Sequence, residues 1–322
     1  MTSKYDCTIL CPGQGAQALG MGRAWCEAST EAAEVMAEAD RILAGTLAKP
    51  LSESCFDGPV EWINQTDVSQ PAILACSVAC WRGITTLDPS IQIQAAAGLS
   101  LGEYTALHLA GVMSFEDAVL TVAARGRLMQ EAAEASSGGM VALMGADDEA
   151  QAVSFCESVL GTLPSGEILV PANFNAPGQI VLSGSETACD AAVSAASDAG
   201  FRAKALPVAG AFHSPLMQPA AARMAEVLDQ VDMVPPEVTV WSNVTAYPHE
   251  NDIVAIKHRL VEQITQPVRW AQSIQDMIEQ GCSGFHELAP GKVLKGLMKR
   301  IDRKLEVRNH DIPDPSAVQA HG

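Results

Sequence analysis

A serine between two glycines constrains the fold of this chain more than any other feature. Residues 98–102 read Gly-Leu-Ser-Leu-Gly, after an apolar run at 91–97 and before a helix-like run at 103–110. This order is typical of a nucleophile elbow, in which a sharp strand-to-helix turn lifts the serine hydroxyl out of the backbone. The glycines leave room for so tight a turn. Ser100 is therefore a candidate nucleophile, although an ordinary strand-to-helix turn can carry the same pattern.

The composition excludes several classes of protein. The chain has 322 residues, 48% hydrophobic and 18% charged, which is typical of an enzyme with a large and a small domain. No apolar run reaches the roughly 18 residues of a membrane span, and the N-terminus does not have the pattern of a signal peptide. We therefore expect a cytoplasmic protein with no membrane association. The net charge of −18 argues against nucleic-acid binding.

Neither the cysteines nor the glycine-rich segment predicts a cofactor. The nine cysteines form no CxxC pair or Cys/His cluster, which is typical of reduced thiols. Cys76 and Cys80 share a predicted helix face, where small core residues are commoner than metal ligands. Residues 12–17 are rich in glycine, but they lack the lysine of a phosphate-binding loop and do not match GxGxxG. We expect no metal and no cofactor.

A small domain is predicted inside a larger one. Beyond residue 140 the patterns predict strands at 140–144, 168–172, 179–183 and 201–206, and helices at 147–160 and 186–199. This is the βαββαβ order of a ferredoxin-like unit. We therefore predict a ferredoxin-like small domain at 136–206, inserted into a large α/β-hydrolase-like domain with a parallel sheet at 1–135 and 207–308. Residues 309–322 have the composition of a flexible tail.

A serine nucleophile requires a base, because the free hydroxyl reacts poorly at neutral pH. The chain has seven histidines. His213 stands in a turn-like segment of small residues at 209–215, directly before a predicted helix, and such loops often carry active-site residues. A histidine beside a Ser-Pro helix start can also be a capping or packing residue. The spacing favours His213 as the base but leaves a packing role open.

Seven segments, in order, resemble those of the malonyl-CoA:acyl carrier protein transacylases of fatty acid synthesis. They lie at residues 12–17, 98–104, 125–130, 173–179, 212–217, 263–270 and 290–294, so the resemblance covers nearly the whole chain. It implies the inserted small domain. It also implies that Ser100 takes the malonyl group from coenzyme A, with His213 as the base. The malonyl group then passes to the phosphopantetheine thiol of acyl carrier protein, in a ping-pong transfer.

The resemblance also implies roles for residues around this pair. The backbone N–H groups of Gln14 and Leu101 would form an oxyanion hole. The backbone carbonyl of Gln263 would orient His213, so that a Ser-His dyad requires no aspartate. Asn175 would line the cleft, although an asparagine before Ala-Pro-Gly is also a common turn former.

Arg125 is the candidate for binding the malonyl carboxylate. On a predicted helix over 114–135 it shares a mostly apolar stripe with Ala118, Val122 and Met129. The resemblance implies that the guanidinium pairs with the carboxylate through two parallel hydrogen bonds, which a lysine would reproduce poorly. The alternative is that Arg125 extends past Met129 into solvent.

Two neighbours of the candidate pair bear on acyl selectivity. Phe212 matches the malonyl-selective form of the family motif, because a phenylalanine leaves little room for the extra methyl group of methylmalonyl. Leu99 departs from the many family members that have a histidine before the serine. This departure puts a second contact to the malonyl carboxylate in doubt, and it can lower selectivity for malonyl over uncharged acyl groups.

A basic run follows residues 290–291 in an otherwise acidic chain. Its members are Lys292, Lys295, Lys299, Arg300, Arg303 and Lys304. They form either a solvated helix face or a docking site for the acidic carrier protein, with Lys292, Lys295 and Lys299 on one face. We expect the protein to be a monomer.

Two other functions remain open. An acyl hydrolase would use Ser100 and His213 with water in place of the carrier thiol, and exclusion of water from the site decides between the two. Arg125 argues against a general esterase, because a buried guanidinium is costly opposite an uncharged acyl chain. A non-catalytic carrier-binding subunit would not need Ser100, His213, Arg125 and Gln263 together.

Overall fold

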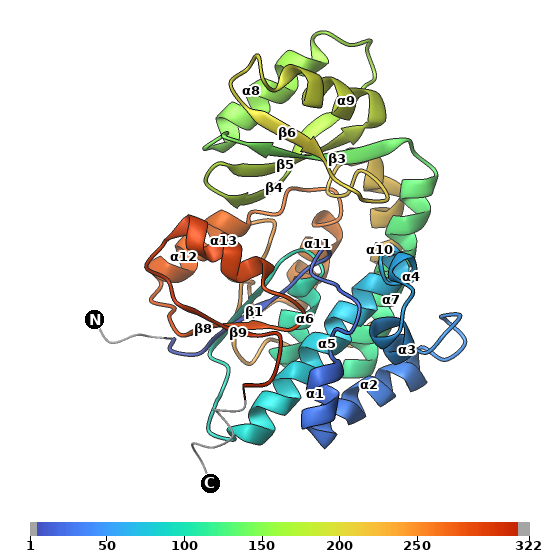
Figure 1. Ribbon diagram of the computed structural model, residues 1–322, viewed down its shortest axis with the longest axis vertical. Coiled ribbons are helices and arrows are strands. Elements are labelled where there is room, and N and C mark those ends of the chain that lie inside the picture. Colours follow the sequence, from blue (N-terminus) through green and yellow to red (C-terminus); the bar gives the residue numbers. More distant parts are fainter. Residues whose placement is uncertain (1–4, 315–322) are drawn as a thin grey trace.

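The structure is a computed structural model that describes residues 5–314, which form two units stacked along the long axis (Figure 1). The larger unit contains a five-stranded sheet and the smaller unit a four-stranded sheet. All strand pairs are parallel in the first sheet and antiparallel in the second. The predicted fold class, a large α/β domain with a smaller inserted domain, is confirmed.

The parallel sheet has the strand order β7-β2-β1-β8-β9. Its strands are β1 (Thr8–Cys11), β2 (Ala95–Gly98), β7 (Thr239–Val240), β8 (Phe285–Leu288) and β9 (Val307–His310). Every residue of β1, β2 and β8 is buried, as expected for parallel strands that are covered on both faces. The carboxyl end of β2 leads directly into the serine turn, so the sheet fixes where that turn lies.

The helices of the larger unit pack around this sheet. They are α1 (Arg23–Ala28), α2 (Thr30–Ile42), α3 (Leu51–Phe56), α4 (Val60–Ile63), α5 (Thr66–Leu87), α6 (Gly102–Leu109), α7 (Phe115–Glu134), α10 (Gln218–Asp229), α11 (Ile253–Glu262), α12 (Trp270–Glu279) and α13 (Val293–Ile301). A short 3-10 turn, Pro215–Met217, precedes α10. None of the helices within the described residues is long and apolar enough to cross a membrane.

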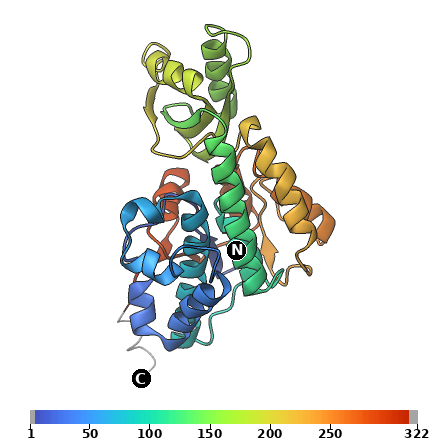
Figure 2. The ribbon, with the colours of Figure 1, turned by 90° about the vertical axis from the view of Figure 1, so that its right-hand side faces the viewer.

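Helix α7 carries Arg125 and runs from the larger unit toward the smaller one (Figure 2). It begins at the predicted cap, where the Ser114 side chain accepts a hydrogen bond from the Asp117 N–H at 3.0 Å. A Cβ at Gly126 would lie 2.6 Å from the Thr66 carbonyl oxygen of α5. The two helices therefore approach closely at this glycine, which brings Arg125 next to polar groups of α5.

The smaller unit has the element order predicted from the sequence. It contains β3 (Gly138–Met144), α8 (Glu149–Leu160), β4 (Leu169–Ala176), β5 (Gln179–Ser185), α9 (Glu186–Ala195) and β6 (Arg202–Ala205). The sheet order β4-β5-β3-β6 is that of a ferredoxin-like unit. Its apolar core is separate from that of the larger unit. The smaller unit therefore has its own core and packs beside the larger unit as a separate body.

The edge strand β4 is fastened to the larger unit. Phe174 N–H donates to the Val268 carbonyl at 2.9 Å, and Val268 N–H donates to the Ala172 carbonyl at 2.8 Å. Arg269 adds two hydrogen bonds to the Glu149 carboxylate, at 2.7 and 3.1 Å. The segment before α12 therefore behaves as a short extra strand that joins the two units.

The prediction of a flexible tail from residue 309 is wrong at its start. Residues 309 and 310 belong to β9, which pairs with β8, and Trp25 Nε1 donates to the His310 carbonyl at 2.8 Å. The sequence Val-Arg-Asn-His has no apolar alternation, so only its pairing with a distant strand makes it β structure. Residues 315–322 of the predicted tail lie outside the described part of the chain.

The strand predicted at residues 91–97 is also shorter than expected. β2 begins at Ala95, so the alternating Ile-Gln-Ile-Gln pattern at 91–94 lies outside the strand. Gln94 still borders the sheet, because its N–H donates to the Cys7 carbonyl at 3.1 Å and its side-chain oxygen accepts from Asp6 N–H.

Candidate active site

Ser100 lies in a strained turn between β2 and α6, with a φ of 53° in the left-handed region. A Cβ at Gly98 would lie 1.9 Å from the Gly102 carbonyl group, and a Cβ at Gly102 would lie 2.2 Å from the Cys11 carbonyl oxygen. Any side chain at either glycine would therefore collide with backbone. This explains physically why the turn requires glycine on both sides of the serine.

We expect Gly98→Ala to lower the free energy of unfolding by about 3 kcal/mol, because overpacking against backbone cannot be relieved by side-chain movement. Gly296→Ala is the matched control, since a Cβ at that helical position meets nothing within 4 Å. That substitution should stabilise the protein by roughly 0.5–1 kcal/mol through helix propensity. Denaturant unfolding of both variants measures the difference, and equal stabilities would show that the elbow tolerates a side chain.

The structure brings Ser100 and His213 into contact. Ser100 Oγ lies 2.8 Å from His213 Nε2, and His213 Nδ1 lies 2.7 Å from the Gln263 carbonyl oxygen. Because a carbonyl only accepts hydrogen bonds, Nδ1 carries the proton and donates it to Gln263. In the neutral ring Nε2 then accepts from the serine hydroxyl. This is the tautomer that a general base for Ser100 requires.

The environment keeps His213 neutral. Burial, and to a smaller extent the nearby positive charge of Arg125, lower the pKa of His213 from 6.5 to about 4. Hydrogen bonding to the Gln263 carbonyl opposes this shift without cancelling it. At neutral pH the imidazole is therefore unprotonated and able to accept a proton.

We expect the rate at which Ser100 is acylated to follow this pKa. The neutral imidazole is the reactive form, so the rate should rise as pH increases through about 4 and stay level above about 5. The kcat/KM for acylation between pH 3.5 and 8 measures the profile, with thermal unfolding recorded at each pH to exclude denaturation. An inflection near 6.5 would contradict the lowered pKa.

Arg125 is buried beside the nucleophile. Its side chain is 1% exposed, so the alternative in which it extends into solvent is wrong. One terminal nitrogen donates to Gln70 Oε1 at 2.6 Å, while the other donates to Gln263 Oε1 at 2.8 Å and to Ser100 Oγ at 3.1 Å. Its Nε is buried without a hydrogen-bond partner among the described residues.

The electrostatics of Arg125 indicate a site for an anion. The hydrogen-bond partners of the guanidinium within residues 5–314 are all neutral. Burial lowers the pKa of Arg125, while the charge of Glu103 acts in the opposite sense. A buried cation without an ion-pair partner is costly, and a ligand carboxylate could recover that cost by using the unpaired Nε–H donor.

Gln263 connects the three groups, although only its carbonyl was assigned a role from the resemblance. Its backbone carbonyl orients His213, and its side-chain oxygen accepts from Arg125. Its side-chain nitrogen donates to the Ser100 carbonyl at 3.0 Å. One fully buried residue at the end of α11 therefore fixes the base, the cation and the nucleophile relative to one another.

The glycine-rich loop after β1 packs against the elbow. A Cβ at Gly13 would lie 2.2 Å from the Leu99 carbonyl oxygen, so the loop backbone touches the residue before the serine. Gln14 is next in this loop, and its side chain donates to Thr66 Oγ1 at 3.4 Å. Leu101 is fully buried and directly precedes α6. Leu101 thus follows the nucleophile in the chain, and Gln14 is next to the glycine that contacts the elbow from the β1 loop.

The remaining predicted residues lie around this cluster at different depths. Phe212 is 5% exposed and packs in the main core next to His213. Leu99 is partly buried against a second apolar cluster. Asn175 lies on β4 of the smaller unit, with its side-chain oxygen buried and unpaired within the described chain. None of these three makes a described hydrogen bond to Ser100 or His213.

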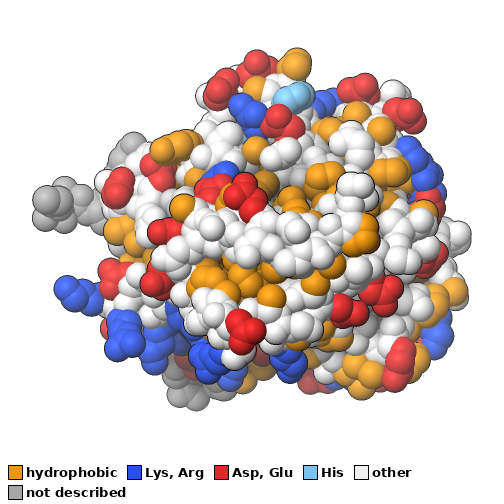
Figure 3. All heavy atoms as spheres, turned by 90° about the horizontal axis from the view of Figure 1, so that it is seen from above, with side chains coloured by type: hydrophobic (Ala, Val, Ile, Leu, Met, Phe, Trp, Pro, Cys, Tyr) orange, Lys and Arg blue, Asp and Glu red, His pale blue; other side chains and the backbone are white. Residues whose placement is uncertain are grey.

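The basic run lies on and just after α13. Lys292, Lys295 and Lys299 are exposed, while the opposite face of the helix buries apolar residues. Seen from above, lysine and arginine side chains gather along the lower left edge, on the side where Figure 1 places α12 and α13 (Figure 3). The helix carries its cations into solvent, away from the hydrogen-bonded cluster at Ser100.

Two residues of the site were missed by the sequence reasoning. Gln70 lies in α5 and holds Arg125, and Asn243 follows β7 and accepts from Ser100 N–H at 2.6 Å. Asn243 also donates to the Gly98 carbonyl at 2.7 Å, so it ties together both sides of the elbow. The sequence held a weak signal for Gln70, a polar residue directly before the apolar run at 71–76.

Comparison with known proteins identifies the family. The family model for the acyl transferase domain matches residues 8–312. The malonyl CoA-acyl carrier protein transacylase of Bacillus subtilis (strain 168) is 40% identical over 316 residues, which cover 97% of this chain and 94% of the relative. The chain belongs to the malonyl-CoA:acyl carrier protein transacylase family. It is an acyltransferase, and the resemblance seen in the sequence is confirmed.

Solved structures of family members have the same fold. An acyl carrier protein S-malonyltransferase from Vibrio cholerae matches with a TM-score of 0.88 and 40% identity, over 98% of this chain and 99% of that one. A malonyl-transacylase, PlMCAT, in complex with the type II PKS acyl-carrier protein AntF matches with a TM-score of 0.89 and 37% identity, over 97% of each chain. The similarity therefore extends through both units of this transacylase family member.

Proposed function

We propose that this acyltransferase moves a malonyl group from malonyl-CoA to the phosphopantetheine thiol of an acyl carrier protein through a malonyl-serine intermediate. One observation carries the choice of acyl group: the buried guanidinium of Arg125 lies 3.1 Å from Ser100 Oγ, and its hydrogen-bond partners in the described part of the chain are neutral. In a malonyl thioester a single methylene separates the carboxylate from the carbonyl carbon under attack. A group that binds this carboxylate must therefore lie close to the nucleophile.

The Ser-His dyad performs the first half of the transfer. His213 Nε2 takes the proton of the Ser100 hydroxyl as Oγ bonds to the thioester carbonyl carbon. The tetrahedral intermediate then collapses, the carbon–sulfur bond breaks, and the imidazolium returns the proton to the sulfur of coenzyme A. In the second half the carrier thiol gives its proton to His213 and attacks the malonyl ester. Ser100 leaves as the alkoxide and recovers the proton.

The backbone N–H groups of Gln14 and Leu101 form the oxyanion hole in this proposal. The contact between Gly13 and the Leu99 carbonyl supports it, because it holds the loop amides beside the elbow. Leu101 directly precedes α6, so its amide shares the partial positive charge of the helix N-terminus. Loss of one such donor typically costs about 3 kcal/mol of transition-state stabilisation.

Three further residues shape the acyl and pantetheine sites in this proposal. Phe212 is held in the main core and cannot move aside for an additional methyl group, which favours malonyl over methylmalonyl. Leu99 offers the malonyl carboxylate no polar contact, so Arg125 alone binds it. Asn175 lines the cleft from the smaller unit and has an unpaired buried oxygen that can accept a hydrogen bond.

The deciding experiment is intact-mass analysis after brief exposure to malonyl-CoA, followed by addition of a phosphopantetheinylated carrier protein. A malonyl adduct on the wild type but not on Ser100→Ala, which then moves to the carrier, is the expected result. Loss of the adduct to water at the same rate with and without carrier would show a hydrolase. If no adduct forms, the proposed function is wrong.

The exposed cations of α13 are the proposed docking site for the acidic carrier protein. We expect Lys295→Glu together with Lys299→Glu to weaken carrier binding by roughly tenfold at low salt, because like charges would then face each other. The control is Arg41→Glu with Lys49→Glu, which changes the net charge equally at other exposed positions. The KM for carrier measures the effect, and equal values for the two double variants would refute the docking site.

A further inference from the structure

Glu103 is a buried carboxylate that the mechanism above does not use. It is fully buried in the first turn of α6, three residues after the nucleophile. A carboxylate at this depth is costly unless its oxygens are fully hydrogen-bonded. The contacts of Glu103 therefore show what it stabilises.

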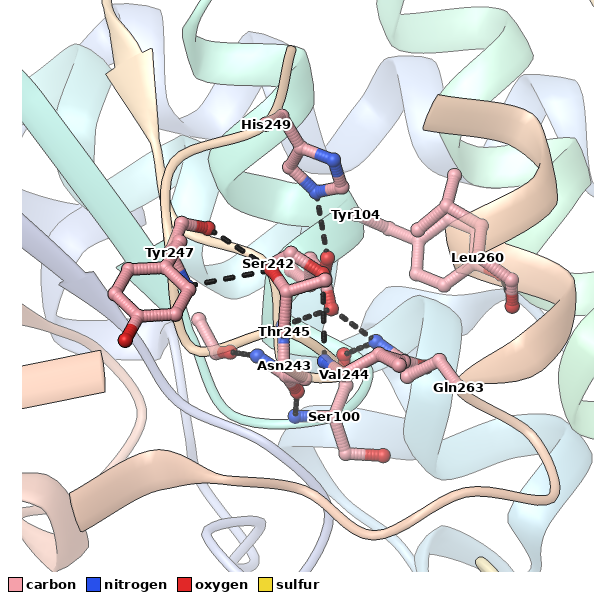
Figure 4. A network of polar contacts seen from close by, with 12 residues as sticks. Ser100, Tyr104, Ser242, Asn243, Val244, Thr245, Tyr247, His249, Leu260 and Gln263 are labelled. Carbon is pink, nitrogen blue, oxygen red and sulfur yellow. Dashed lines mark hydrogen bonds and ion pairs between the residues drawn. The ribbon is translucent and has the colours of Figure 1, made fainter. Parts of the chain in front are cut away.

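Its two oxygens have different partners, and Figure 4 labels these partners as His249, Gln263 and Asn243. Oε2 accepts from the side-chain nitrogen of Gln263 at 2.5 Å and from Asn243 N–H at 3.2 Å. Oε1 lies 2.7 Å from His249 Nε2, and both of these side chains are only 1% exposed. Oε2 is therefore bonded to residues that also contact Ser100, whereas Oε1 is bonded to His249, which makes no described hydrogen bond to Ser100.

Gln263 and Asn243, which donate to Oε2, are also the residues that hold the backbone of Ser100. Asn243 accepts from Ser100 N–H, and Gln263 donates to the Ser100 carbonyl. The backbone N–H and carbonyl of Ser100 are therefore both hydrogen-bonded to residues that are themselves hydrogen-bonded to Glu103. Gln263 also accepts hydrogen bonds from His213 through its backbone carbonyl and from Arg125 through its side-chain oxygen, so Oε2 of Glu103 is linked indirectly to both. No described hydrogen bond joins Glu103 to Ser100 Oγ, His213 or Arg125 directly.

His249, which contacts Oε1, lies in the loop after β7. His249 N–H donates to the Val240 carbonyl at 2.8 Å, and Ser242 N–H donates to the Tyr247 carbonyl at 2.9 Å, so the loop folds back on its own strand. This loop inserts the His249 imidazole against Glu103. Asn243 belongs to the same loop, but among the described hydrogen bonds the His249 side chain contacts Oε1, whereas Gln263 and Asn243 contact Oε2. The two oxygens of Glu103 can therefore be tested separately.

We propose that Glu103 is a positioning residue for acyl transfer, which aligns Ser100 and its partners by holding Gln263 and Asn243 through Oε2. The proposal rests on the proposed function for its substrate. The contact of Oε1 with His249 serves stability only. Loss of the Oε2 acceptor should lower the rate, whereas loss of His249 should lower the melting temperature and leave the rate nearly intact.

The test compares four variants. Glu103→Met removes both acceptors at similar volume, and Glu103→Gln keeps an oxygen for Gln263 and Asn243 while its NH₂ group faces His249. Glu103→Asp withdraws the carboxylate by one methylene, and His249→Ala breaks only the outer contact. Each is assayed for melting temperature, for kcat of malonyl transfer, and for the rate at which a fluorophosphonate ester phosphonylates Ser100 with release of fluoride.

We expect Glu103→Met to lower both rates by about a hundredfold, because small misplacements of reacting groups cost this much. Glu103→Gln and His249→Ala should retain most of both rates. If Glu103→Met does not fold, Glu103→Asp replaces it in the comparison and should lower both rates in the same direction.

Three results would overturn the positioning role. These are unchanged rates in Glu103→Met or its replacement, equal losses in Glu103→Gln and Glu103→Met, or equal losses in His249→Ala and Glu103→Met. The fluorophosphonate reaction separates this proposal from the proposed function, since it reports the alignment of Ser100 without malonyl-CoA. A wild-type protein that reacts with the probe but takes no malonyl group would refute only the proposed function.

Discussion

His213→Ala is expected to lower the rate of malonyl transfer by roughly 10⁴-fold or more, the scale on which removal of one member of a nucleophile–base pair acts. Without Nε2 at 2.8 Å the Ser100 hydroxyl has no proton acceptor, and the departing thiolate has no proton donor. Both halves of the reaction should slow. Single-turnover formation of the malonyl-serine adduct, followed by mass spectrometry, measures the first half alone.

The matched control for this prediction is His108→Ala. His108 is partly buried and also places Nδ1 near a backbone carbonyl, that of Met113 at 3.0 Å, but it has no serine partner among the described hydrogen bonds. It should lose stability without a comparable loss of rate. If the two alanine variants lost activity to the same extent, the effect of His213 would be structural and the dyad would be wrong.

Arg125→Ala is expected to lower kcat/KM for malonyl-CoA by roughly 10²- to 10³-fold, the range for losing a buried charged hydrogen-bond partner. Transfer of an acetyl group should be unchanged or faster, because acetyl has no carboxylate and a buried cation opposite it is unfavourable. The ratio of the two kcat/KM values is therefore the decisive measurement, since it cancels any general damage to the site.

Arg127→Ala provides the control on the same helix. Arg127 is two residues away, but its side chain is 55% exposed and it pairs with Glu131 at the surface. Its removal should change neither rate appreciably. Equal losses for malonyl and acetyl in Arg125→Ala would show that the guanidinium supports the structure of the site and does not bind the carboxylate.

The sequence predicted those parts of the site that depend on local backbone geometry. The elbow at Ser100 follows from glycine spacing, because a Cβ at Gly98 collides with Gly102, four positions along the chain. The collision at Gly102 is with the remote Cys11 carbonyl and is seen only in the structure. His213 was favoured only modestly by its turn, since its φ of 56° and its contacts result from packing of distant segments. The family resemblance, not the spacing, singled it out.

The parts that were missed depend on contacts between remote elements. Gln70 and Asn243 are single polar residues whose roles arise only when α5, α7 and the β7 loop meet. The same reason explains the error at β9, a polar segment that becomes a strand because β8 offers it an unpaired edge. Periodicity along one segment carries no information about such partners.

The short segment from Gln263 to Val268 makes hydrogen bonds to two different parts of the molecule, the active site and the small domain. At one end the Gln263 carbonyl orients the imidazole of His213, and at the other Val268 hydrogen-bonds to the Ala172 carbonyl and the Phe174 N–H of strand β4. One short piece of main chain therefore contacts both the small domain and the proton acceptor. A tilt of the small domain large enough to break the pairing at Val268 would also displace the Gln263 carbonyl, which orients the His213 imidazole.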